Sequence, residues 1–240
     1  MATTTFDGLL DWHLKHGSHG FPGDDGGTCI NEAAVVVAGF AYREVTTVTD
    51  LPESFCPVIS QFCLTLNDSM PEGEILNRLR PFAVRLSGSS DTRKIAFQRA
   101  RHLAMRAAQF FASLAIGSVD AKAARRLVRA ASHDDALAIL DDLVANGSST
   151  DKPYHGWPDG AAKSLGAARL ALAKALSEQQ GIYVAELAAI SAIRAAAINP
   201  AAWDLAIDTI ESVLAIGRRA DPIESSLIDQ RAKEALAAVC

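Results

Sequence analysis

The feature that most constrains the fold is an alanine-rich stretch that runs from Asp91 to the C-terminus with few interruptions. Alanine has the highest helix propensity of the amino acids, and its small side chain lets neighbouring helices approach closely. Stop and start signals divide the stretch at Gly117 with Asp120, Ser132 with Asp135, Asp159 and Pro200. We therefore expect an all-α protein in which residues 91–240 form a helical bundle.

Residues 1–90 have a more varied composition and are expected to form an N-terminal helical module. Apolar residues at helical spacing predict helices over residues 6–16, over 30–39 and from Pro57 to Asp68. The β-branched stretch 42–50 has no visible strand partner, so we expect a connector there. Glycine and serine at 87–90 mark the boundary, and Asp91 is the expected cap of a long helix that reaches Ile116.

The densest group of reactive side chains is HLKHGSHGFPGDDGGTC, residues 13–29. A first hypothesis places a nucleophile at Cys29, because unpaired N–H groups at a helix N-terminus stabilise a thiolate and lower its pKa. His16 or His19 would then act as the base. His13 falls on the apolar stripe of the first expected helix, where we expect a core residue. This hypothesis predicts a thiol-dependent hydrolase or transferase.

A second hypothesis is a zinc-stabilised module. Its candidate ligands are His13, His16, His19 and Cys29, with an oxygen from Asp24 or Asp25. Zinc accepts nitrogen and sulfur ligands, but this spacing departs from the paired patterns of structural zinc sites. We expect no other cofactor, because the chain has no Walker loop, no dinucleotide-binding fingerprint and no GxSxG nucleophile elbow.

The interpretation we prefer treats the same stretch as an ordered turn. Its glycines permit positive φ angles, and Asp24 and Asp25 can cap backbone amides. Phe21 and Trp12 would fix the turn to the core. On this interpretation Cys29 is a small packed residue at the start of a helix.

The charge balance argues against binding of nucleic acid by bulk electrostatics. The net charge is −5 and the isoelectric point about 5.7, whereas phosphate binding requires clustered cations. Basic residues do cluster once, at Arg93, Lys94, Arg99, Arg101 and Arg106 and then at Lys122, Arg125, Arg126 and Arg129. Helical spacing places some of them on one solvated face. Such a face could dock an acidic protein or a nucleic-acid backbone.

The spacing of the cysteines does not indicate a set of disulfide bonds. They are Cys29, Cys56, Cys63 and Cys240, and the two central ones lie about 10 Å apart along a helix, too far for a disulfide. We therefore expect free thiols. The chain also lacks a secretory signal and any apolar run of the roughly 18 residues that a membrane span needs. Together these features predict a cytoplasmic protein.

The N-terminal segment WHLKHGSHGFPGDDGGTCINEAAVVVAGF, with SFCPVISQFCLTLNDSMP and RPFAVRLSG further on, resembles a family of uncharacterised proteins of bacteria and their phages. The resemblance covers residues 9–90, and AIGRRADPI near the C-terminus is similar too. It implies an alanine-rich helical region after the histidine-rich turn. The phage association of the family favours a protein that acts by binding, such as a host-interaction or defence-counteracting factor.

These observations predict a non-enzymatic helical protein that binds a protein partner through its alanine-rich or basic helix faces. The absence of the common catalytic motifs and the large helical surface support this expectation. Alanine-rich faces are also compatible with a homodimer, because they let two helices approach closely.

Overall fold

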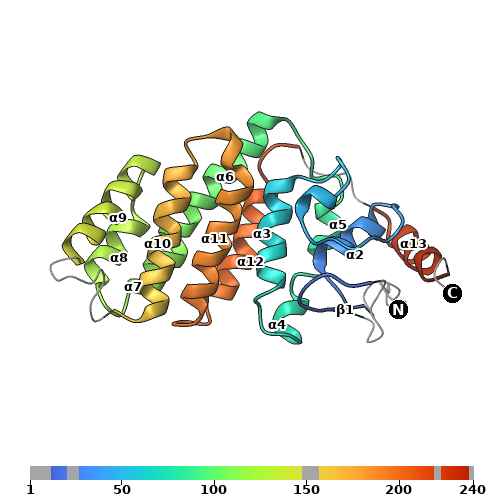
Figure 1. Cartoon of the computed structure of the whole chain (residues 1–240), viewed down its shortest axis with the longest axis horizontal. Coiled ribbons are helices and arrows are strands. Elements are labelled where there is room, and N and C mark those ends of the chain that lie inside the picture. The colour runs from blue at the N-terminus through green and yellow to red at the C-terminus, as the bar shows by residue number, and fades with distance from the viewer. Residues whose placement is uncertain (1–11, 21–26, 148–156, 219–222, 238–240) are drawn as a thin grey trace, which may run out of the picture. The chain divides into compact units, whose positions relative to one another are not determined.

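The computed structural model describes residues 12–20, 27–147, 157–218 and 223–237 of the 240-residue chain. Over these residues the protein is all-α, as predicted, and their only strands form one two-residue pair (Figure 1). None of the helices in these ranges combines the length and the apolar character that a membrane span requires.

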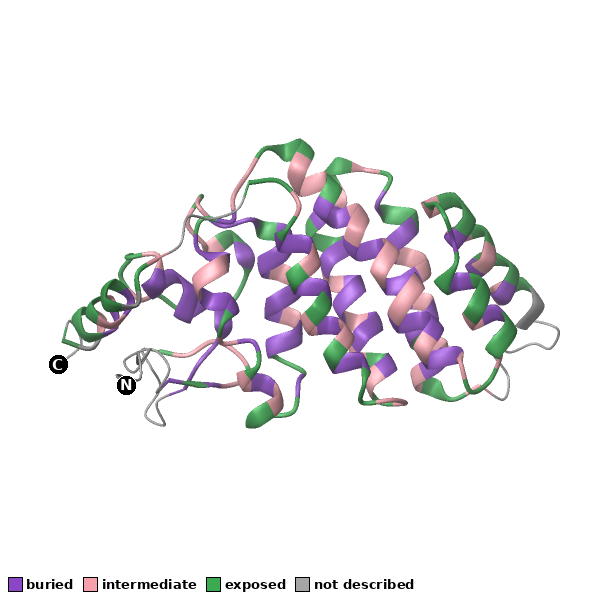
Figure 2. Ribbon diagram, turned by 180° about the vertical axis from the view of Figure 1, so that it is seen from behind, coloured by how far each residue is buried: buried purple, intermediate pink, exposed green. Residues whose placement is uncertain are grey.

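The described residues divide into two compact units. The first comprises the residues up to Asp91 together with those from Leu214 onward, and the second comprises Thr92–Val213. In both units the buried residues follow the inward faces of the helices, and exposed residues follow the outward faces (Figure 2). Each unit therefore has an apolar core of its own.

The first unit is built around α2 (Ile30–Val37), in which all eight residues are buried. The other elements are β1 (His13–Leu14), β2 (Gly27–Thr28), η1 (Val48–Asp50), α3 (Pro57–Asn67), α4 (Glu74–Asn77), α5 (Phe82–Leu86) and α13 (Ser225–Ala237). Helices α3, α5 and α13 pack against α2. The Arg231 side chain of α13 donates a hydrogen bond to the carbonyl of Val37, the last residue of α2.

The helices expected from residue 30 and from Pro57 are confirmed as α2 and α3. Cys29 is the N-cap of α2, and Gly39, at φ +88°, follows its C-terminal end. That conformation favours glycine because other residues place a Cβ atom against the backbone. Residues 42–47 connect the elements without regular structure, as expected.

The helix expected over residues 6–16 is wrong where the structure describes it. Residues 6–11 lie outside the described ranges, and His13–Leu14 form β1, which pairs with β2 in parallel. Burial alternates from Trp12 through His13 to Leu14, which is the period of a strand. The expected core position of His13 is therefore also wrong, because its side chain is exposed.

The second unit is a helical bundle. Its elements are α6 (Arg93–Arg106), η2 (Ala107–Ala112), α7 (Ser113–Ile116), α8 (Ala121–Val128), α9 (His133–Gly147), α10 (Asp159–Lys174), η3 (Glu178–Gln180), α11 (Gly181–Ala196) and α12 (Ala202–Leu214). Leu214, the last residue of α12, belongs to the first unit. Helices α10 and α11 lie side by side and run in opposite directions (Figure 1).

The long helix expected to reach Ile116 is confirmed as the continuous run α6, η2 and α7. Its N-cap is Thr92, which accepts a hydrogen bond from the Ile95 amide. Asp91 is thus not the cap, and its carboxylate instead accepts a hydrogen bond from the Arg218 amide at 2.7 Å. The η2 segment is a π-helix, an irregularity that sequence patterning did not indicate.

The alanine-rich helices pack as closely as their composition predicts. Where α10 meets α11, the hydroxyls of Ser164 and Ser191 lie 3.0 Å apart, and each also bonds to the other residue's carbonyl. Gly160 lies at a second close approach, where an added Cβ atom would stand 2.9 Å from the Arg194 carbonyl oxygen. Small residues at these points allow the helix axes to come together.

Candidate functional site

The carboxylate of Glu32 organises the surroundings of Cys29. Glu32 is fully buried in the first turn of α2. Its donors are the amides of His19 (2.9 Å), Cys29 (2.8 Å) and Val45 (3.2 Å) and the hydroxyls of Thr28 (3.2 Å) and Tyr42 (3.0 Å). The Tyr42 ring in turn meets buried Trp12 edge-on, with 6.5 Å between ring centres. One carboxylate therefore joins three segments of the chain.

The thiol of Cys29 is fully buried. Its burial, followed by the nearby Glu32 carboxylate, raises the pKa of Cys29 well above its usual value. The expected lowering of that pKa is wrong, because burial and the Glu32 carboxylate outweigh the backbone N–H groups of Asn31 and Glu32, which favour the thiolate. Asn67 accepts from the Ile30 amide at 3.1 Å, and Glu32 accepts from Cys29. The Cys29 sulfur serves as a cap that accepts from the Glu32 amide at 3.4 Å.

The histidines of this stretch lie in different environments. His13 and His16 are exposed; Nε2 of His16 lies 2.7 Å from the Met70 carbonyl oxygen and Nδ1 lies 3.9 Å from the Glu72 carboxylate. His19 is half-buried, and its buried Nε2 makes no hydrogen bond. In the described part of the chain, no histidine ring is hydrogen-bonded to Cys29. The structure thus does not assemble the expected cysteine–histidine pair.

The proposed zinc ligands are not brought together either. Within the described ranges, no three His, Cys, Asp or Glu side chains are grouped so that they could hold a metal ion. The candidates His13, His16, His19 and Cys29 all belong to these ranges, whereas Asp24, Asp25 and Phe21 lie outside them. Cys29, Cys56 and Cys63 are free thiols, as predicted, and all three are buried.

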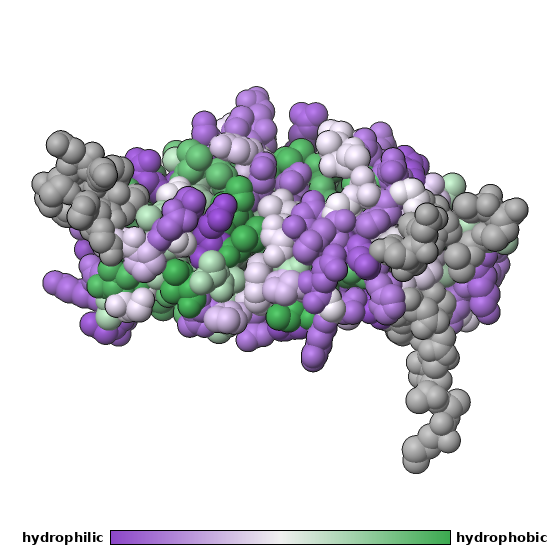
Figure 3. Space-filling view, turned by 60° about the horizontal axis from the view of Figure 1, so that its bottom comes forward, coloured by the Kyte–Doolittle hydropathy of each residue, from purple (hydrophilic) through white to green (hydrophobic). Residues whose placement is uncertain are grey.

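A different site is found in the second unit, where large apolar side chains remain exposed. Val128 is 53% exposed and Leu176 62% exposed. On the face drawn in Figure 3, green hydrophobic patches lie between purple hydrophilic side chains. Exposed apolar surface rimmed by polar groups is typical of binding sites.

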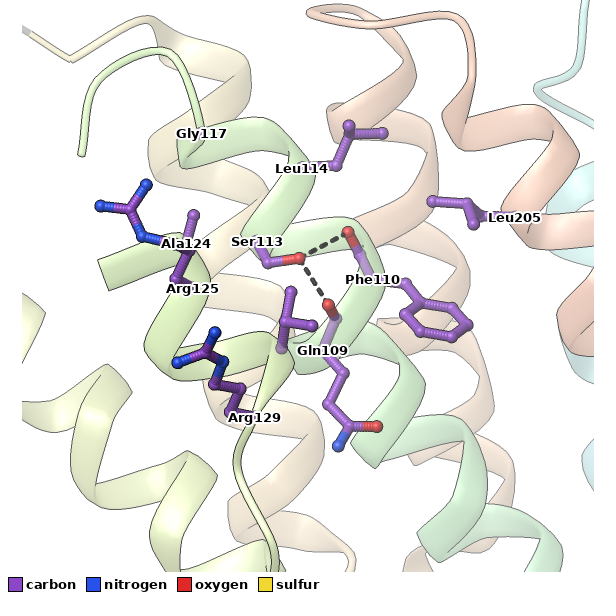
Figure 4. A pocket seen from close by; sticks show the side chains of 10 residues that line it. Gln109, Phe110, Ser113, Leu114, Gly117, Ala124, Arg125, Arg129 and Leu205 are labelled. Atoms are coloured by element: carbon purple, nitrogen blue, oxygen red, sulfur yellow. Dashed lines mark hydrogen bonds between the residues drawn. The ribbon is translucent and has the colours of Figure 1, made fainter. Parts of the chain in front are cut away.

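Val128 lines an open groove that we call the η2 groove, with a cavity volume of about 480 Å³. Its floor is formed by Gln109 and Phe110 of η2, Ser113 and Leu114 at the start of α7, and Gly117, which follows that helix. Ala124, Arg125, Val128 and Arg129 line one side at α8, and Leu205 of α12 lines the other (Figure 4).

The π-helix shapes the floor of the η2 groove. A π-helix displaces the regular hydrogen-bond pattern, and such segments often occur at functional sites. Here the Ser113 hydroxyl bonds to the carbonyls of Gln109 and Phe110 (Figure 4). The Gln109 side chain donates a hydrogen bond of 2.9 Å to the Ala130 carbonyl just beyond α8. The Gln109 bond links the floor of the groove at η2 to its side at the end of α8.

The groove carries positive charge without an internal counter-ion. Its lining includes Arg125 and Arg129 and no acidic residue. Neither of these exposed guanidinium groups forms an ion pair or side-chain hydrogen bond with the described residues. Arg126, between them in sequence, differs because it pairs with Asp142 of α9 at 3.2 Å. The two arginines of the groove are therefore available to a ligand.

A third arginine contacts Phe110 at the floor of the groove. The guanidinium of Arg106 lies over the Phe110 ring at 4.3 Å from its centre, and its Nε donates to Nε2 of His102 at 3.3 Å. Burial, and then the charge of Arg106, lower the pKa of His102 to about 4. The imidazole is therefore neutral near pH 7. Its Nε2, which also lies 2.8 Å from the Ser212 hydroxyl, accepts this hydrogen bond in the tautomer that carries the proton on Nδ1.

The sequence identified the basic residues of α8 but not the groove. Phe110, Val128 and Leu205 belong to three elements, and in sequence each looks like an ordinary apolar helix residue. One available signal was that Val128 lies three residues from Arg125, a spacing that places both side chains on the same charged face of a helix.

No known protein family, curated protein or solved structure matches the chain. The resemblance of the N-terminal segment to bacterial and phage proteins therefore stays a prediction.

Proposed function

We propose that this chain is a non-enzymatic cytoplasmic protein that binds another protein through the η2 groove. The observation that carries the proposal is that exposed Val128 shares one groove with two arginines that form no ion pair with the described residues. Apolar area supplies the favourable free energy of association, and unpaired charges at its edge supply orientation and specificity.

A protein fits this surface better than a small molecule does. A second groove, of about 500 Å³, lies on the other side of α8 and shares Arg129 with the η2 groove. Helix α8 therefore forms a ridge between two shallow grooves. A protein partner can cover a surface of this shape. Small-molecule sites are usually enclosed and bury most of their ligand.

The buried Cys29 gives the competing thiol chemistry no support. A nucleophilic cysteine needs a low thiol pKa and access to substrate, and Cys29 has a raised pKa and no solvent exposure. We therefore assign the Cys29–Glu32 arrangement a structural role, as the cap that holds α2 and the histidine-rich turn together.

Two charge-matched variants test the proposal. Val128→Asp places a charge in the η2 groove, whereas Leu176→Asp places one at a similarly exposed apolar position elsewhere in the second unit. In affinity capture from the native host, Val128→Asp is expected to lose a partner that the wild type and Leu176→Asp retain. Equal capture by all three proteins would contradict the proposal.

A measured molar mass separates the two kinds of protein partner. We expect light scattering to show that the Val128→Asp substitution leaves the mass of the purified protein unchanged. A dimer that dissociates in Val128→Asp would assign the groove to a second copy of this chain and contradict the role proposed for a different protein.

A further inference from the structure

We propose that the partner segment is an acidic amphipathic helix, with carboxylates that contact Arg125 and Arg129 and apolar side chains that cover Val128 and Phe110. This inference rests on the proposed function and adds the chemistry of the partner.

The first argument is charge complementarity. Arg125 on α8 and Arg129, the C-cap of that helix, lie four residues apart, so their Cβ atoms are about 6 Å apart on the same face. Like charges at this spacing repel each other and slightly destabilise the free helix. Because neither arginine has a counter-ion among the described residues, a carboxylate from outside would relieve this repulsion.

The second argument is geometric. Acidic residues four apart on a partner helix are separated by about 6 Å along its axis, which matches the separation of the two arginines. The groove is lined mainly by helical residues of η2, α7, α8 and α12, so it offers side chains and no strand edge. A helix satisfies its own backbone and suits such a surface, whereas an extended peptide needs a strand edge.

The third argument separates an acidic protein from a nucleic acid. Nucleic-acid binding depends on many cations along a phosphate backbone. Here two arginines that pair with none of the described residues border a floor that is apolar at Phe110 and Leu114, on a chain with a net charge of −5. The apolar floor would remain uncovered by phosphates, whereas leucine side chains of a helix would bury it.

Three labelled probes test the inference by fluorescence anisotropy with the full chain. One is a synthetic helical peptide with leucines on one face and glutamates four residues apart beside them. The second has glutamine in place of every glutamate, and the third is a single-stranded oligothymidine. The glutamate peptide is expected to bind about tenfold more tightly than the glutamine peptide near 0.05 M salt, with a smaller ratio near 0.5 M.

Matched neutralisations locate the charge effect. Arg125→Gln and Arg129→Gln are each expected to weaken binding of the glutamate peptide about threefold. Arg126→Gln removes the same charge from an arginine that is paired with Asp142, and a change below about twofold is expected. Circular dichroism confirms that each variant is folded.

Several outcomes would overturn the inference. These are equal affinity for the two peptides, tighter binding of the oligothymidine, equal effects of all three neutralisations, or no binding of either peptide up to about 1 mM. Val128→Asp separates this failure from failure of the proposed function. If the two peptides bind with equal affinity and Val128→Asp abolishes binding of both, the groove remains the binding site and only the acidic chemistry of the partner is contradicted. If Val128→Asp changes the affinity of neither peptide, the groove itself is contradicted as the binding site.

Discussion

The guanidinium of Arg106 stacks over the ring of Phe110, 4.3 Å from its centre. A cation over an aromatic face stabilises that ring by about 0.5–1 kcal/mol at exposed sites, so Arg106 holds Phe110 in place at the floor of the η2 groove. The arrangement depends on His102, which accepts the Arg106 Nε–H and can do so only while its Nε2 carries no proton.

Stability is expected to fall as the pH drops below about 6.5. The pKa of His102 is about 4 in the folded protein and near 6.5 in an unfolded chain. Between these two pH values His102 is protonated in the unfolded chain but not in the folded protein. The stabilising contribution of His102 to the free energy of unfolding is therefore complete above pH 6.5 and is lost as the pH falls towards 4. The slope from this residue is less than about 1.4 kcal/mol per pH unit, because His102 is only half-buried.

Urea unfolding at pH 7, 6 and 5 measures this dependence. A His102→Gln variant keeps an acceptor near Arg106 without a group that titrates in this range, and its stability is expected to fall less steeply than that of the wild type. Equal slopes for the two proteins would show that His102 does not carry the effect.

Glu32→Gln is expected to destabilise the first unit by about 2–4 kcal/mol. The substitution replaces a carboxylate that accepts bonds from three amides and two hydroxyls with an amide whose NH2 group faces those donors. Glu44→Gln makes the same chemical change at an exposed position and is expected to alter stability by less than about 0.5 kcal/mol. Denaturant unfolding measures both, and similar values for the two variants would contradict the role of Glu32.

The buried thiols are expected to react only when the protein opens. Cys29, Cys56 and Cys63 are all buried, and burial raises the pKa of Cys29 and of Cys63. Iodoacetamide labelling at pH 6, read out by peptide mass spectrometry, should give equally slow modification of all three and fast modification in urea. Selective labelling of Cys29 in the folded protein would revive the thiol-enzyme hypothesis.

Two glycines of α10 are expected to respond oppositely to alanine. Gly166 has open space where a Cβ atom would go, so Gly166→Ala should stabilise the protein by up to about 1 kcal/mol through helix propensity. At Gly160 the new atom would lie 2.9 Å from the Arg194 backbone carbonyl, and a loss of about 1–3 kcal/mol is expected. Thermal unfolding compares them, and stabilisation by both would contradict the close approach of α10 and α11.

Local patterns predicted much of the fold, because most helices here are specified by nearby residues. Alanine content, the Pro57 start and the Gly39 stop act within one or two turns. The strand at His13–Leu14 was missed because its partner, Gly27–Thr28, is not adjacent to it in sequence. An apolar spacing that fits a helix can also fit a strand over so few residues.

The candidate sites required tertiary information. The sequence placed Cys29 at a helix N-terminus but could not show that the thiol is fully buried beside the Glu32 carboxylate, which together raise its pKa. It also found the arginines of α8 but not which of them is paired, since Asp142 comes from the next helix. The π-helix that shapes the groove has no recognisable sequence signal in the Ala107–Ala112 segment.

The most direct test of the η2 groove is site-specific photo-crosslinking in native-host extract. A photoreactive amino acid at position 128 should give one predominant adduct with a partner protein, and the same amino acid at position 176 should not, although Val128 and Leu176 are similarly exposed. Adducts of equal yield from the two positions, or none from position 128, would contradict binding at the groove.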